Sequence, residues 1–118
     1  MANLALFLKS EDFEEFRAGD VVFREGDVGD RMFVVKEGEV EVRVGDRLVD
    51  TLGSGRLVGE MALIDGGARS ATVVACSDSK LVPIDEKRFV FLVQQTPFFA
   101  VEVMREIVAR VRSMNRKD

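Results

Sequence analysis

The sequence predicts a mainly β domain, a small barrel or jelly roll, followed by two helices. From residue 20 to 84, short apolar or alternating runs recur between glycine-marked turns, a pattern typical of domains built from many short strands. After residue 84 the apolar spacing becomes helical. A chain of 118 residues can bury one core but not two, so we expect a single domain over residues 1–118.

A short helix is expected at the N-terminus. The segment LALFL lacks a basic flank, is too short to span a membrane and runs directly into SEDFEEF. We therefore expect neither a signal peptide nor a membrane contact. The apolar side chains of this helix are expected to pack on the core: Leu4, Leu6, Phe7 and Leu8.

The strand-like runs between residues 20 and 84 are bounded by turn residues. In the run 40–44 three valines alternate with Glu41 and Arg43, which predicts one buried face and one wet face. The turn EGDVGD contains Asp27 and Asp30 but lacks the ligand pattern of a calcium loop, so we interpret it as a turn and expect no metal site. The expected strands are 21–23, 32–35, 40–44, 47–52, 70–75 and 80–84.

Two helices are expected after the strands. Asp85 is a suitable N-cap for a helix from about Glu86 to Gln95. Pro97 suits the first turn of a final helix that ends near Met114, because a missing N–H costs nothing there. Thr96 is the expected cap of this second helix.

The final helix carries apolar residues at alternating spacings of four and three, as in a coiled coil. This seam either packs only on the barrel of its own chain or forms a homodimer, and both alternatives stay open. The basic residues near the chain end are interpreted as favourable charge at a helix C-terminus. The seam consists of Ala100, Met104, Ile107, Val111 and Met114, widened by Phe99, Val103 and Val108. The basic residues are Arg110, Arg112, Arg116 and Lys117.

Composition excludes several functions. The chain has no histidine, which removes imidazole catalysis and histidine-based metal sites, so we expect no enzyme and no metal cofactor. The net charge of −4 and the pI near 5.0 argue against a nucleic-acid surface. The single cysteine, Cys76, cannot form an internal disulfide and is expected to be a buried inert thiol, which is consistent with a cytoplasmic protein.

The segment 59–75, GEMALIDGGARSATVVA, has the layout of an anion pocket. A glycine turn at Gly59 leads into a short helical turn whose N–H groups, on Met61 and Ala62, are free to bind a small anion. Arg69 adds a full positive charge and a planar fork suited to phosphate oxygens.

Glu60 makes this pocket more specific. A carboxylate would repel a phosphate, so the same ligand must also carry an uncharged donor such as a sugar hydroxyl. Phosphate and ribose together indicate a nucleotide. Ser70, directly after Arg69, adds a hydroxyl that can donate to the phosphate or to the base edge.

These motifs resemble the phosphate-binding cassette of the cyclic nucleotide-binding domain family, which includes catabolite activators, protein kinase regulatory subunits and cyclic-nucleotide-gated channels. The similarity rests on GEMALI and ARSATVVA and extends upstream through RAGDVVFREGDVGDRMFVVKEGEVEVRV. The chain departs from the family at Val58, where Phe is frequent, and at Gly67 and Ala68, where an acidic–Pro pair is frequent. Neither departure changes a polar ligand contact.

The resemblance implies an eight-stranded β-roll, or double-stranded β-helix, closed by a short N-terminal helix and two C-terminal helices. It implies a non-catalytic sensor in which Glu60 binds the ribose 2′-hydroxyl, Arg69 binds the cyclic phosphate and the C-terminal helices move as a lid. Backbone N–H groups and the lining of the base complete the expected site. Its residues are Gly59, Glu60, Met61, Ala62, Arg69, Ser70, Ala71, Val42 and Val49, with Met114 over the purine face and Asn115 at its edge. A frayed terminus that points into solvent stays open as the alternative for Met114 and Asn115.

Cyclic AMP is favoured over cyclic GMP because catabolite activators that bind cyclic AMP carry a serine after the arginine, as here at Ser70. One alternative is a degenerate domain of the same fold that binds a protein and no ligand. A transcription regulator would need a helix-turn-helix after Asp118, so no nucleic-acid contact is expected from this chain. A free-standing sensor and a piece of a larger regulator both remain open.

Overall fold

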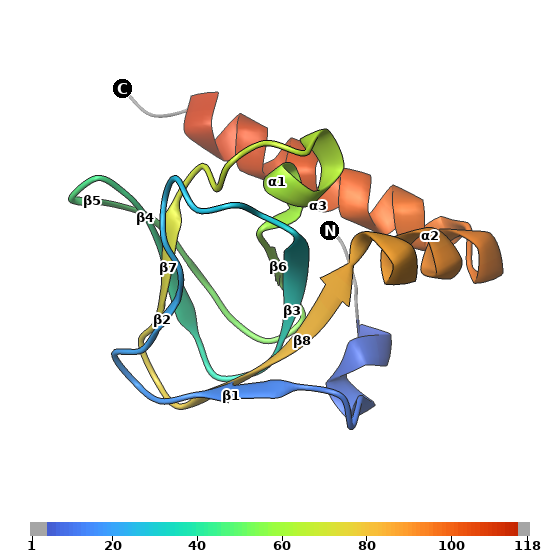
Figure 1. The fold of residues 1–118 in the computed structure, drawn as a ribbon, viewed down its shortest axis with the longest axis horizontal. Helices are drawn as coiled ribbons and strands as arrows, with labels where there is room; N and C mark the ends of the chain where they lie inside the picture. Colours follow the sequence, from blue (N-terminus) through green and yellow to red (C-terminus); the bar gives the residue numbers. More distant parts are fainter. Residues whose placement is uncertain (1–4, 116–118) are drawn as a thin grey trace.

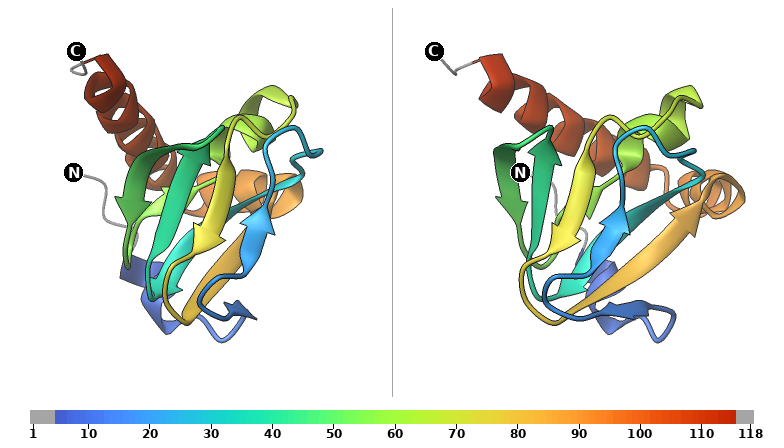
Figure 2. Two further views of the ribbon diagram at one scale, coloured as in Figure 1. Left: turned by 90° about the vertical axis from the view of Figure 1, so that its left-hand side faces the viewer. Right: turned by 60° about the vertical axis from the view of Figure 1, so that its left-hand side comes forward.

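The computed structural model describes residues 5–115, with side chains from 7 to 112. Its strands form two antiparallel sheets of four strands each, in the orders β1-β8-β3-β6 and β2-β7-β4-β5. The two sheets face each other in a jelly-roll-like arrangement, with α3 lying across one end (Figures 1 and 2). The strands are β1 Glu14–Phe16, β2 Val21–Phe23, β3 Arg31–Glu37, β4 Val40–Val44, β5 Arg47–Leu52, β6 Leu57–Val58, β7 Thr72–Ala75 and β8 Ser79–Asp85.

The helices lie at the ends of the chain and within the segment that joins β6 to β7. A short 3₁₀ helix, η1, precedes the strands, α1 follows β6, and α2 and α3 follow the last strand. In Figure 1, α1 lies beside α3 at the top of the molecule and α2 lies at the right. Their bounds are η1 Ala5–Lys9, α1 Glu60–Asp65, α2 Glu86–Gln95 and α3 Phe98–Asn115.

Strand β3 connects the two parts of the core. Its side chains alternate, with Met32 and Val34 in a cluster shared with the helices, and Phe33 and Val35 in a cluster between the sheets. All four are fully buried, so this strand reads as a continuous apolar run rather than an alternating one. Strands β6 and β8 contribute to both clusters as well, so the sheet that contains β3 packs on the helices with one face and on the other sheet with its opposite face.

The N-terminal helix packs as expected where its side chains are described. Phe7 is buried in the cluster shared with the helices, and its ring centroid lies 5.9 Å from that of Phe99 in α3. Leu8 is half-buried. Leu4 lies outside the described residues, and the side chain of Leu6 lies outside the described side chains.

The expected C-terminal helices are present with small changes at their ends. α2 has the predicted bounds, and the Asp85 carboxylate accepts a hydrogen bond of 2.8 Å from the N–H of Arg88. α3 begins at Phe98 rather than Pro97. Its first turn is tight, because Phe99 donates to the carbonyl of Thr96 at 2.8 Å.

The apolar seam of α3 is divided between two faces. Phe99 and Val103 are buried, and Ile107 packs against the same core cluster. Met104 and Val111, by contrast, are about half exposed. The inner residues therefore belong to this chain's own core, and the outer ones do not.

Several expectations need correction. The six strand runs expected from the residues do not include β1 and β6, since segments as short as EEF and LV carry no clear period, whereas the eight strands agree with the number that the resemblance implies. Val44 is 45% exposed instead of buried, because it lies next to the turn at Gly45. Cys76 is exposed, because it lies just after β7. The pKa of its thiol is raised by partial desolvation and by two nearby glutamates, so it is protonated at neutral pH.

Among the described residues, no helix combines the length and the apolar character that crossing a bilayer requires.

Candidate functional site

The turn into α1 requires a glycine. Gly59 has a φ of 80° and caps α1 without a side-chain hydrogen bond. A Cβ at this position would lie 2.6 Å from Nη1 of Arg69 and 3.2 Å from the ring of Phe23. The absence of a side chain thus lets Arg69 pass against the start of the helix.

Arg69 is a buried cation with few protein partners. It is 6% exposed, and its guanidinium lies over the ring of Phe23, with 3.9 Å from Cζ to the ring centroid. Nη1 donates to the carbonyl of Gly59 at 3.2 Å, whereas Nε has no hydrogen-bond partner among the described residues. Desolvation lowers the pKa of Arg69, and the charges of Asp30 and Asp27 partly oppose this shift. A buried guanidinium in this situation is suited to an anionic ligand.

The position of Arg69 is set by the turn between β2 and β3. The N–H of Arg69 donates to the carbonyl of Asp27 at 2.8 Å, and the carbonyl of Arg69 accepts from Gly26 at 2.9 Å. Val28 and Ala68 form an isolated bridge beside these bonds. Ala68, one of the positions where the sequence departs from the pattern it resembles, therefore lies in a segment whose backbone pairs with the turn between β2 and β3.

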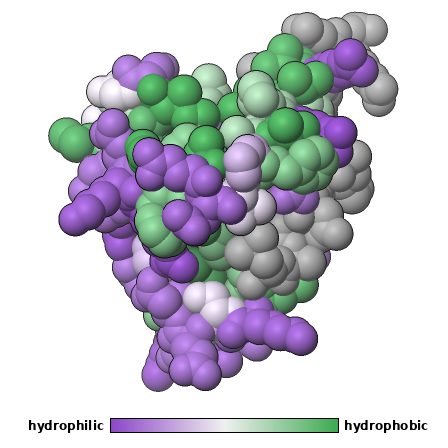
Figure 3. Space-filling model, turned by 90° about the vertical axis from the view of Figure 1, so that its right-hand side faces the viewer, coloured by the Kyte–Doolittle hydropathy of each residue, from purple (hydrophilic) through white to green (hydrophobic). Residues whose placement is uncertain are grey.

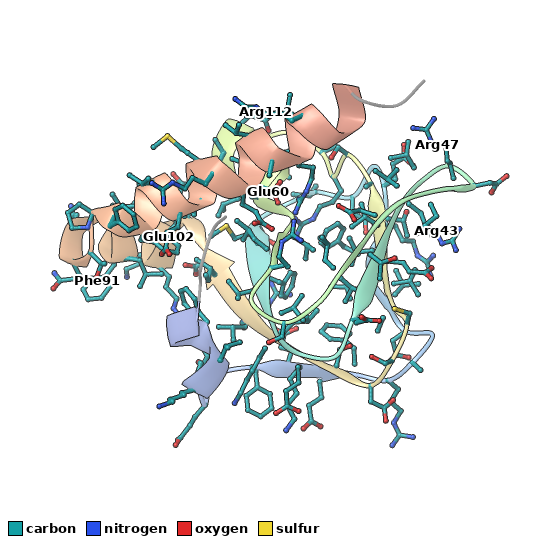
Figure 4. The ribbon with its side chains drawn as sticks, turned by 180° about the vertical axis from the view of Figure 1, so that it is seen from behind. Arg43, Arg47, Glu60, Phe91, Glu102 and Arg112 are labelled. Atoms are coloured by element: carbon teal, nitrogen blue, oxygen red, sulfur yellow. The ribbon has the colours of Figure 1, made fainter. Side chains whose placement is uncertain are left out.

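Glu60 is 2% exposed and paired with a residue of α3. Nη1 of Arg110 donates to both of its carboxylate oxygens, at 3.0 and 2.8 Å. Nη2 of Arg110 donates to the carbonyl of Leu57 at 2.8 Å. Figure 4 shows Glu60 beneath α3, whereas Arg112 of the same helix points outward.

This contact corrects the interpretation of the C-terminal basic cluster. Arg110 is not a solvated charge at a helix end, because its side chain is only 13% exposed and holds a buried carboxylate. Arg112 is exposed, as expected of a solvated charge. Arg116 and Lys117 lie outside the described residues.

A cavity of about 60 Å³ lies between these two arginines. Seven of the expected cassette residues line it together with Val42 of β4. Val49 of β5 does not line it. The side chains of Met114 and Asn115 lie outside the described side chains. The expected residues that line the cavity are Gly59, Glu60, Met61, Ala62, Arg69, Ser70, Ala71 and Val42.

Four further residues line the cavity that sequence reasoning did not assign to it: Phe23, Val58, Val73 and Arg110. Val73 follows from the alternation in β7, since Ala71 and Val73 lie on the same side of that strand. Phe23 and Arg110 are 46 and 41 residues from Arg69 in sequence, so no local pattern connects them to the cassette. Within the described residues, no group of acidic residues or cysteine is arranged to hold a metal ion.

Comparison with known proteins points to one family. A family model described as the cyclic nucleotide-binding domain matches residues 13–96. A cyclic nucleotide-gated potassium channel of Rhizobium etli is 41% identical over 93 residues, covering 79% of this chain and 26% of the channel. The cyclic AMP receptor protein of Thermus thermophilus is 32% identical over 99 residues, covering 80% of this chain and 46% of the receptor.

A comparison with solved structures leads to the same family. The catabolite activator protein of Thermus thermophilus is similar to this chain with a TM-score of 0.78 and 30% identity, covering 87% of this chain and 52% of that one. The chain thus spans about a quarter of the channel and about half of the receptor. The fold, the cassette and the family model lead to one conclusion. The chain belongs to the cyclic nucleotide-binding domain family.

Proposed function

We propose that the cavity binds a cyclic nucleotide, cyclic AMP in preference to cyclic GMP, and that residues 1–118 act as one non-catalytic sensor domain. The observation that carries the proposal is the buried guanidinium of Arg69, whose hydrogen bond among the described residues goes to the backbone carbonyl of Gly59. No described carboxylate lies within ion-pair distance of Arg69, although Asp27 and Asp30 are near enough to affect its pKa. A singly charged phosphodiester would supply the missing anion.

The cassette offers the groups that such a ligand needs. Arg69 would pair the cyclic phosphate, with help from the hydroxyl of Ser70, which is exposed to the cavity. Glu60 keeps unused lone pairs beside those that Arg110 occupies, because a carboxylate has about four acceptor positions. It would therefore accept from the ribose 2′-hydroxyl. Backbone N–H groups of Met61, Ala62 and Ala71 would complete the phosphate contacts.

The size of the cavity supports movement of the C-terminal helices. Ligand pockets usually measure about 300–1,000 Å³, whereas the cavity here measures about 60 Å³. Arg110 spans one side of it from α3 to Glu60. A nucleotide would therefore enter only if α3 shifts. Once bound, the nucleotide would favour the arrangement of α3 that contacts it.

The preference for cyclic AMP rests on two similarities. Ser70 stands where catabolite activators that bind cyclic AMP carry a serine. A relative that is 32% identical is named a cyclic AMP receptor protein. Both support cyclic AMP over cyclic GMP as the ligand of this chain.

Titration calorimetry with both cyclic nucleotides tests this function. We expect cyclic AMP to bind with micromolar or better affinity. Arg69→Ala should weaken binding by about 2 to 4 kcal/mol, because a charge-assisted bidentate contact is lost. Arg47→Ala is the matched control, since Arg47 is an exposed arginine on the β5 hairpin, away from Glu60 (Figure 4). Heat from neither nucleotide would contradict the sensor and favour the alternative of a protein-interaction module.

The outer face of α3 is the surface on which we place a homodimer contact. Met104, Val108 and Val111 are 55%, 48% and 49% exposed, at the spacings of four and three that two-stranded coiled coils use. Figure 3, a view from the side of the molecule where α2 lies, shows apolar side chains interspersed with hydrophilic ones in its upper part and mainly hydrophilic ones lower down. Sedimentation with and without cyclic AMP tests the dimer, and a monomer in both conditions would rule it out.

A further inference from the structure

A buried chain of alternating charges joins α3 to the cassette. Nε of Arg56, in the turn before β6, donates to Glu106 of α3 at 2.6 Å. The same Glu106 oxygen accepts from Nη2 of Arg110 at 3.3 Å. Arg110 then holds both oxygens of Glu60. We call these four residues, Arg56, Glu106, Arg110 and Glu60, the charge ladder.

Glu106 occupies the centre of the charge ladder. It is 2% exposed, and it also accepts from the N–H of Leu57 at 3.3 Å. Its contact with Arg110 joins two residues one helical turn apart, so its position on α3 determines where the guanidinium of Arg110 can lie. Glu106 is too deeply buried to be a solvated surface charge, and it is absent from the lining of the cavity.

Burial of the charges of Glu60, Glu106 and Arg110 is costly, and this cost is offset only while each charge keeps its opposite partner. Glu60 is held by an arginine from another element, and that arginine is held by Glu106. The orientation of the Glu60 carboxylate therefore depends on the docking of α3. Arg56, whose side chain is 31% exposed, anchors the far end of the charge ladder to β6.

We propose that Glu106 is a positioning residue for ribose recognition, acting through Arg110 on Glu60, and that Arg56 and Glu106 clamp α3 against β6. This inference rests on the proposed role of Glu60 as the acceptor of the 2′-hydroxyl. Glu106 touches no ligand, yet recognition of the ribose depends on it.

A two-by-two comparison tests the positioning role. The wild-type chain and Glu106→Gln are each titrated with cyclic AMP and with 2′-deoxy cyclic AMP. Removing the 2′-hydroxyl should weaken binding to the wild type about tenfold, the value of one hydrogen bond to a charged group. In Glu106→Gln this ratio should fall to about threefold or less, since Glu60 is no longer held in place.

Glu86→Gln is the control, because Glu86 is an exposed glutamate in the first turn of α2 and is not part of the charge ladder. It should keep the wild-type ratio. A Glu106→Gln variant that weakens both nucleotides by the same factor would overturn the inference, since a merely structural role predicts that result. If Glu106→Gln fails to fold, as judged by circular dichroism, Arg56→Gln takes its place with the same expectations.

Hydrogen exchange without ligand separates this inference from the proposed function. Glu106→Gln and Arg56→Gln should speed exchange of the amides of α3 and leave those of β3 and β8 unchanged. If the wild type binds neither nucleotide, the proposed function fails and ribose positioning fails with it, while the exchange data still test the clamp. Unchanged exchange in α3 in both variants would overturn the clamp itself.

Discussion

Arg69 and Arg110 are buried arginines beside the same cavity, but their electrostatic situations are opposite. Arg69 has one backbone carbonyl and an aromatic ring as partners. Arg110 contacts two buried carboxylates and a carbonyl. The first carries charge that the described protein does not neutralise, which suits a ligand, and the second carries charge that the fold itself uses. Burial alone therefore does not distinguish these two arginines, whereas their carboxylate partners do.

The largest expected effect is on stability, and it separates the two arginines. Arg110→Met leaves the buried carboxylate of Glu60 without its ion-pair partner and removes one of the two arginines from Glu106, so the free energy of unfolding should fall by about 3 to 5 kcal/mol. Arg69→Met removes a cation that has no described ion-pair partner, and it should change stability by less than about 1 kcal/mol. Urea denaturation of both variants measures this. Equal losses would show that Arg69 is held by the fold in the same way as Arg110.

A smaller effect is expected from the two glycines at the ends of α1. Gly59 and Gly66 have φ values of 80° and 72°, so alanine at either site should cost about 1 to 2 kcal/mol of stability from backbone strain. Only at Gly59 does the added Cβ meet Arg69, at 2.6 Å from its Nη1. Gly59→Ala should therefore also weaken cyclic AMP about tenfold or more, and Gly66→Ala should not. Thermal melts measure the stability of both variants, and calorimetry measures their affinity for cyclic AMP. Equal affinities of the two variants would contradict a role of Arg69 in binding.

The smallest effect on stability is expected on the outer face of α3. Val108→Glu should change the free energy of unfolding by at most about 0.5 kcal/mol, because the side chain is already exposed. The same substitution should convert a dimer to a monomer in sedimentation, since it places a charge in the apolar stripe. Ala109→Glu, an exposed neighbour outside that stripe, should leave the dimer intact. Dissociation of the dimer in both variants would show that the dimer contact does not depend on this apolar stripe.

The cassette was predictable from sequence because its residues are close together in the chain. Gly59, Glu60 and Arg69 carry the glycine turn, the carboxylate and the cation within eleven residues, and the structure places all of them at one cavity. The helix bounds were predictable for the same reason, since the cap at Asp85 acts on a residue three positions away. Local chemistry was sufficient for these features.

The rest of the site depends on contacts between distant residues. Arg110 pairs with a carboxylate fifty residues earlier, and its sequence context is that of an ordinary basic helix end. Phe23 lies in a three-residue strand and reaches Arg69 only because β2 pairs with β7. Strands β1 and β6 are too short to show a period, and they exist because β8 and β3 offer them open edges.

The backbone pairing between the β2–β3 turn and Arg69 has a consequence for how such domains diverge. Two hydrogen bonds and one bridge join residues 26–28 to residues 68 and 69, so the length of this exposed turn determines where the buried cation lies. Surface turns usually accept insertions. This one should accept changes of residue type at Val28, which is 88% exposed, but not an added residue. Among relatives, its length should vary less than the lengths of the other hairpins.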